Sequence, residues 1–108
     1  MADTTVADTI LEQLTRQPSV GRAMGVLAAM IGAHGFVAAG DGVRFKWKAR
    51  AANGANTVVI TLDPSDTYNV AFWSVRGAKE TFKGQFNDVY AESLTELFER
   101  ETKLYLRF

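Results

Sequence analysis

Residues 57–76 read TVVITLDPSDTYNVAFWSVR, two runs of β-branched and aromatic residues separated by one turn signal. Runs of this composition favour strands. The Asp-Pro-Ser-Asp sequence at 63–66 is typical of a tight turn, because proline presets φ and aspartate bonds to the turn backbone. Two strands joined by so short a connection are antiparallel. We therefore predict an antiparallel hairpin with strands at 56–62 and 67–76.

A second stretch, residues 43–50, reads VRFKWKAR and alternates apolar with basic residues. Successive side chains of a strand point to opposite faces of the sheet, so Val43, Phe45 and Trp47 share one face. The basic residues then share the other face, with no acid among them: Arg44, Lys46, Lys48 and Arg50. We predict a strand at 43–49 that has one core face and one positive face.

Apolar residues at helical spacing predict three helices, at 3–16, 20–31 and 88–102. Ser19 and Asp88 are expected to cap the second and third helices, because their side chains can accept hydrogen bonds from first-turn amides. The order of elements indicates an α+β protein with two N-terminal helices, an antiparallel meander of three to five strands, and a C-terminal helix packed on one face of the sheet.

A chain of 108 residues with 47% hydrophobic and 22% charged side chains is expected to form one domain, 1–108, with a core of its own. We divide that domain into a helical N-terminal part at 1–32, an antiparallel sheet at 36–83 and the C-terminal helix at 88–102. Hairpin-length connections within the sheet argue against parallel crossovers.

Composition excludes several classes of function. The chain has no cysteine, which excludes disulfides and thiolate-bound metals. Its one histidine, His34, has no acid or second histidine near it in sequence, so no catalytic triad or metal site is indicated. No stretch is long enough to span a bilayer, and no secretion signal is visible. We expect a cytoplasmic, non-enzymatic protein that uses no cofactor or metal and contacts no membrane.

The basic strand face is the main candidate for a partner-binding surface. Its cations are spaced about 6.6–6.8 Å apart along a strand, which suits the phosphates of a nucleic acid. Trp73 and Arg76 are the candidate anchors beside it, because aromatic residues and arginine dominate interface energetics. The sequence leaves three explanations open: protection of an edge strand against pairing, a protein partner, or a nucleic acid.

The last helix offers an alternative, acidic surface. Glu92, Glu96 and Glu99 follow one another at spacings of four and three residues, and together they can imitate a row of phosphates. Charge reversal at Arg44 and Lys46 distinguishes the two surfaces, because it abolishes binding only if the basic face is used. A homodimer is also left open, with Trp73 and the apolar tail at 104–108 as its two candidate patches.

Several segments resemble a recurring pattern in small phage and mobile-element accessory proteins. The resemblance extends over roughly residues 23–108, and these are its segments: GAHGFV at 32–37, GVRFK at 42–46, ITLDPSDTY at 60–68, VRG at 75–77, DVYAESL at 88–94 and LFERETKLYL at 97–106. Members commonly have lysine in place of His34 and glycine in place of Lys103. Neither residue is therefore expected to be a fixed functional element.

The resemblance implies a biological setting and no catalytic residue, since that family has no settled biochemical activity. Small single-domain products of phages, prophages and integrative elements often bind a host protein, and anti-CRISPR inhibitors are prominent examples. We therefore expect a protein that binds and inhibits a host defence complex, first of all a CRISPR effector, by steric or nucleic-acid-mimicking binding. The alternative is a nucleic-acid-binding accessory protein of phage replication or recombination that uses the basic strand face.

Overall fold

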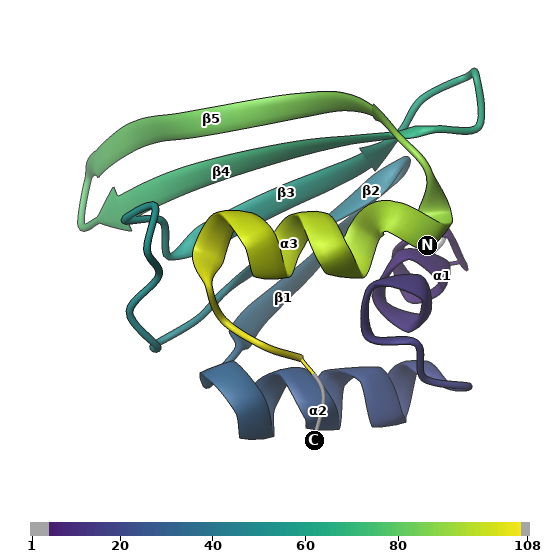
Figure 1. Ribbon diagram of the computed structural model, residues 1–108, viewed down its shortest axis with the longest axis horizontal. Helices are drawn as coiled ribbons and strands as arrows, with labels where there is room; N and C mark the ends of the chain where they lie inside the picture. Colours follow the sequence, from purple (N-terminus) through teal and green to yellow (C-terminus); the bar gives the residue numbers. More distant parts are fainter. Residues whose placement is uncertain (1–4, 107–108) are drawn as a thin grey trace.

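The structure, a computed structural model, describes residues 5–106 and has the α+β architecture that the sequence predicts (Figure 1). The N-terminal end of the first predicted helix, with Asp3, lies outside the described residues, as do residues 107 and 108 of the tail. In chain order the elements are α1 (Thr5–Thr15), α2 (Val20–Ile31), β1 (His34–Ala39), β2 (Gly42–Lys46), β3 (Thr57–Leu62), β4 (Tyr68–Arg76), β5 (Lys79–Val89), the 3-10 helix η1 (Ala91–Ser93) and α3 (Leu94–Thr102).

The five strands form one antiparallel meander in the order β1-β2-β3-β4-β5. The predicted hairpin is confirmed: β3 pairs with β4 from Leu62 opposite Tyr68 to Thr57 opposite Trp73. Asp63 closes the turn between them, since its carboxylate accepts hydrogen bonds from the backbone N–H and the Oγ of Ser65, at 3.1 and 2.8 Å. These bonds favour the charged carboxylate and lower the pKa of Asp63.

All three α-helices lie on one side of the sheet, and none crosses the other side (Figure 1). Apolar side chains on the helix side of β2, β3 and β4 alternate with exposed or half-buried ones, which is the period-two pattern of a sheet with one buried face. Ser19 caps α2 as predicted, accepting from the Arg22 N–H at 3.3 Å. Within residues 5–106 no helix is both long and apolar enough to cross a membrane.

One predicted strand is too long. The strand expected at 43–49 ends at Lys46, because the chain then turns toward the end of α2. There the backbone N–H groups of Lys48 and Ala49 both donate to the Ile31 carbonyl oxygen, at 3.2 and 3.1 Å. Lys48 and Arg50 consequently lie beyond the strand, in the connection between β2 and β3.

Another predicted strand is too short. β5 runs on to Val89 instead of ending at 83, because two shifts of register let the strand continue past Gly84. Asp88 is accordingly not a helix cap: it belongs to β5 with a φ of 57°, and α3 begins only at Leu94. An extra residue in one strand of an antiparallel pair bends that strand, which explains how β5 follows the twist of the sheet.

The close approach of β2 to β3 at Gly42 gives a first prediction. A Cβ at this position would overlap the Ile60 carbonyl oxygen and lie 2.9 Å from the Thr61 Cα. We expect Gly42→Ala to lower the free energy of unfolding by about 1–3 kcal/mol, since the ladder must separate to admit a methyl group. Urea unfolding followed by circular dichroism measures the effect. Gly25→Ala in α2, where a Cβ meets nothing within 4 Å, is the control.

Candidate functional site

The side of the sheet that no helix covers has an apolar centre. We call it the open face and define it by side chains that alternate with the core along β2 to β5: Arg44, Lys46, Val59, Ala71, Trp73, Val75, Glu80 and Phe82. At its middle, Trp73 and Phe82 meet edge to face with their ring centroids 5.2 Å apart. Phe82 remains 52% exposed, which is unusual for a large apolar side chain.

A shallow depression of about 340 Å³ lies in the open face. Its floor is made by apolar side chains of β3 and β4, namely Val59, Ala71, Trp73 and Val75. Arg44 of β2 borders the depression on one side and Glu80 of β5 on the other. The open face is therefore an apolar surface with one positive and one negative margin.

The structure contradicts one explanation of the basic strand. One explanation was that Arg44 and Lys46 lie on an edge strand and discourage the pairing of another strand. However, β2 is an interior strand, with β1 on one side and β3 on the other. The free edges belong to β1 and β5. On β5, two irregular registers together with Lys79 and Lys83 can discourage strand addition.

Five cations gather at the end of the sheet where β4 turns into β5. We call this the basic end and define it by Lys48, Arg50, Arg76, Lys79 and Lys83. They line two depressions of about 570 and 320 Å³ that share Gly54 and Arg76. Within residues 5–106, no aspartate or glutamate lines either depression. Among the described residues none of the five cations forms an ion pair, so their charge is directed to solvent or to a partner.

Asn56 fixes the loop that bears Lys48 and Arg50 to the strand that bears Arg76. Its Nδ2 donates to the Val75 carbonyl oxygen at 2.9 Å, and its Oδ1 accepts from the Val75 N–H at 2.8 Å. The Asn56 backbone N–H also donates to the Trp73 carbonyl oxygen at 2.9 Å. This arrangement brings residues more than twenty positions apart in sequence to one place.

These bonds give a second prediction. Asn56→Ala leaves the backbone N–H and carbonyl of Val75 without their side-chain partner, which we expect to cost about 2 kcal/mol in the free energy of unfolding. The measurement is thermal or urea unfolding. Asn69→Ala serves as the control, because Asn69 is similarly buried and makes one long bond of 3.5 Å to Asp63. Equal losses in the two variants would contradict this account of Asn56.

The structure divides the predicted basic site into two groups. Arg44, Lys46 and Trp73 lie on the open face, whereas Lys48, Arg50 and Arg76 lie at the basic end. The single row of four cations is wrong, because β2 stops at Lys46. Sequence reasoning missed Lys79 and Lys83 as members of the second group. The available signal was their position shortly after Arg76, three and seven residues further along the chain.

The acidic alternative also changes in the structure. Glu92 and Glu96 are exposed, but Glu99 is only 6% exposed and its carboxylate accepts the Leu106 N–H at 2.9 Å. Glu99 therefore holds the C-terminal tail against α3 and does not extend an outer row of acids. The exposed acidic surface is therefore reduced from the three predicted glutamates to two, Glu92 and Glu96.

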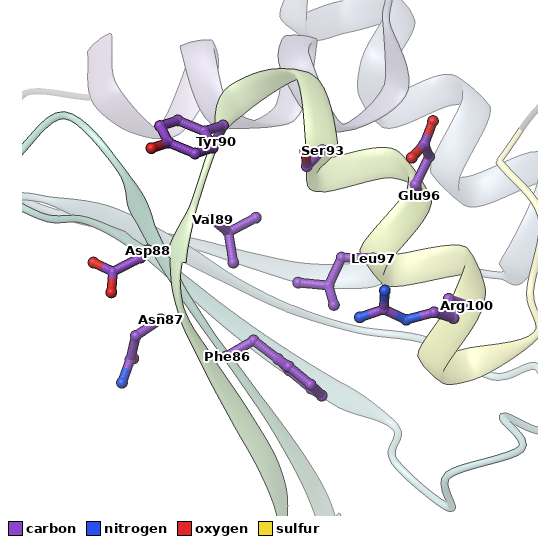
Figure 2. A pocket seen from close by; sticks show the side chains of 9 residues that line it. All are labelled: Phe86, Asn87, Asp88, Val89, Tyr90, Ser93, Glu96, Leu97 and Arg100. Atoms are coloured by element: carbon purple, nitrogen blue, oxygen red, sulfur yellow. The ribbon is translucent and has the colours of Figure 1, made fainter.

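Glu96 borders a groove of about 290 Å³ between the end of β5 and α3. Figure 2 shows Phe86 and Leu97 pointing toward each other across this groove, while Asn87 and Asp88 point away from the helix. Arg100 lies beside Leu97, and its Nε is 3.1 Å from the Glu101 carboxylate. The groove thus mixes both signs of charge over an apolar floor.

In residues 5–106 no three side chains of the metal-ligating types gather. His34 is exposed at the first position of β1 and lines a shallow depression with Arg44 and Lys46. Comparison of the chain with protein-family models, with curated proteins and with solved structures found no match. The site must therefore be interpreted from its own geometry and charge.

Proposed function

We propose that this chain is a non-enzymatic binding protein of a phage or mobile element that inhibits a host defence complex, with a CRISPR effector as the first target to test. The basic end is the partner-binding surface. The observation that supports this proposal is the gathering of Lys48, Arg50, Arg76, Lys79 and Lys83 around two depressions that no acid of the described part of the chain lines.

Electrostatics favours an acidic partner surface at this place. Like charges crowded together repel one another, and nothing among the described residues pairs with these five. A partner that brings carboxylates relieves the repulsion and is guided to the site by its charge. Two of the cations are arginines, whose planar guanidinium groups bind carboxylates in a bidentate manner.

The proposed inhibition is tested in cells. A bacterial host with an active CRISPR system and a matching phage is plated with and without expression of the chain. We expect expression to restore plaque formation to the level of a host that lacks the effector. A set of hosts with different defence systems identifies the target, and unchanged plating in all of them would contradict an inhibitory function.

A second candidate function, binding of single-stranded nucleic acid, is favoured by one observation. The Trp73–Phe82 pair lies on an open antiparallel sheet, and β4 and β5 lead from it directly to the basic end. Aromatic platforms beside a positive groove are how single strands are bound without sequence preference. This candidate predicts affinity for DNA or RNA oligonucleotides that falls steeply as salt rises. Fluorescence anisotropy with no binding at low salt would eliminate it.

A further inference from the structure

The open face has a charge pattern that is complementary to itself. Arg44 and Glu80 border the same depression from opposite sides, with β3 and β4 between them. Neither side chain forms an ion pair with any other described residue. The surface between them is apolar and includes Trp73.

A twofold axis can place the positive margin of each copy against the negative margin of the other. In a symmetric dimer the same patch occurs on both subunits, so a contact between residue i and residue j is made twice. With the two open faces stacked, Arg44 of one copy can meet Glu80 of the second copy, and the reverse pair forms at the other margin. The apolar centres then meet at the spacing of about 10 Å that is usual between packed sheets.

We propose that the open face is the interface of a homodimer, held by Trp73 and its apolar neighbours at the centre and by two Arg44–Glu80 ion pairs at the margins. Trp73 has the residue type and the central position of an interface anchor. One exposed apolar side chain borders it, that of Phe82 on β5, at 52% exposure. A second copy of the chain presents both an apolar centre and the opposite charges at its margins, and so its open face is complementary to this one.

The proposal goes beyond the proposed function and does not depend on it. The basic end lies at one end of the sheet and is formed by residues other than those of the interface. A dimer therefore presents two basic ends, and a partner with two acidic sites would bind it with higher avidity than a monomer.

Sedimentation velocity over a dilution series of the full chain tests the dimer. We expect the sedimenting mass to rise with concentration from 11.9 kDa to twice that value. Arg44→Glu and Glu80→Arg should each weaken the dimer at least about tenfold, because each replaces both ion pairs with like charges. The double variant Arg44→Glu/Glu80→Arg should restore it, since the pairs then form with reversed polarity.

Two controls keep the test specific. Arg22→Glu changes an exposed charge on α2, on the other side of the sheet, and should leave the dimer intact. Circular dichroism of every variant excludes unfolding as the cause of a change in mass. Tryptophan fluorescence adds a direct signal: Trp47 is buried at 3% exposure, so a change with concentration comes from Trp73.

Three results would each overturn the proposal. The chain could stay monomeric at every concentration, which would leave the open face to the host partner or to a nucleic acid. It could dimerise without any change at Trp73, which would place the interface elsewhere. Finally, the single charge reversals could dissociate the dimer while the double variant fails to restore it, which would exclude the Arg44–Glu80 pairing.

Discussion

Replacing Phe98 with alanine should lower the free energy of unfolding by about 3–5 kcal/mol, which is the usual cost of removing a buried phenylalanine side chain. Phe98 of α3 is 1% exposed and contacts three aromatic rings, two of them on strands and the third, Trp47, directly after β2. Its ring centroid lies 5.3 Å from that of Trp47, 6.0 Å from that of Phe72 and 6.4 Å from that of Phe45. These contacts attach the C-terminal helix to β2 and β4, so their loss should loosen the whole helix layer.

Urea unfolding monitored by circular dichroism measures this effect. A small domain has a total stability of about 5–15 kcal/mol, so Phe98→Ala should remove a large share of it and clearly lower the urea concentration at the unfolding midpoint. Tyr105→Ala is the control, because Tyr105 follows α3 and is exposed. We expect that change to cost less than about 0.5 kcal/mol. A loss at Phe98 no larger than the loss at Tyr105 would contradict the aromatic core described above.

The double charge reversal Arg50→Glu/Arg76→Glu should weaken capture of the host partner by on the order of a thousandfold. Arginine residues that anchor an interface commonly contribute about 2 kcal/mol or more each, and every 1.4 kcal/mol corresponds to a factor of ten. Both residues line the larger depression of the basic end, one from the β2–β3 loop and one from β4. Biolayer interferometry with the purified target measures the change.

The matched variant is Glu92→Lys/Glu96→Lys, which reverses two exposed acids on the opposite candidate surface. It should leave partner binding unchanged if the basic end is the site. The reverse outcome, loss of binding with the glutamate variant alone, would assign the interaction to the acidic surface of η1 and α3. Dimer formation should survive the Arg50→Glu/Arg76→Glu change, so failure of the proposed function can be told apart from failure of the proposed dimer.

Local chemistry explains which parts of the fold could be predicted from the sequence. The hairpin at 57–76 followed from its turn residues and its β-branched runs, and the helix at 20–31 followed from Ser19 and the glycine at 32. The residues at which β2 and β5 end could not be predicted from the sequence, because they depend on hydrogen bonds to residues far away in the chain. β2 ends at Lys46 because the amides of Lys48 and Ala49 bond to Ile31, and β5 continues past Gly84 because two shifts of register keep it paired with β4.

The candidate site was predictable only in part, for a similar reason. Alternation along the strand correctly placed Arg44 and Lys46 opposite the core residue Phe45. The basic end, however, joins a loop with the β4–β5 turn, and no spacing in the sequence indicates that Arg50 and Lys83 lie at the same end of the sheet. Burial of Glu99 likewise depends on the tail that returns to its carboxylate, through the Leu106 N–H.

The most direct test of the central claim is affinity purification of the tagged chain from a host lysate, with and without nuclease treatment, followed by mass spectrometry. The Arg50→Glu/Arg76→Glu variant is purified in parallel. We predict that one component of a defence complex is captured by the natural chain, survives nuclease and is absent from the variant sample. Prey that disappears with nuclease, or that the variant captures equally well, would contradict an inhibitor that binds a host protein through its basic end.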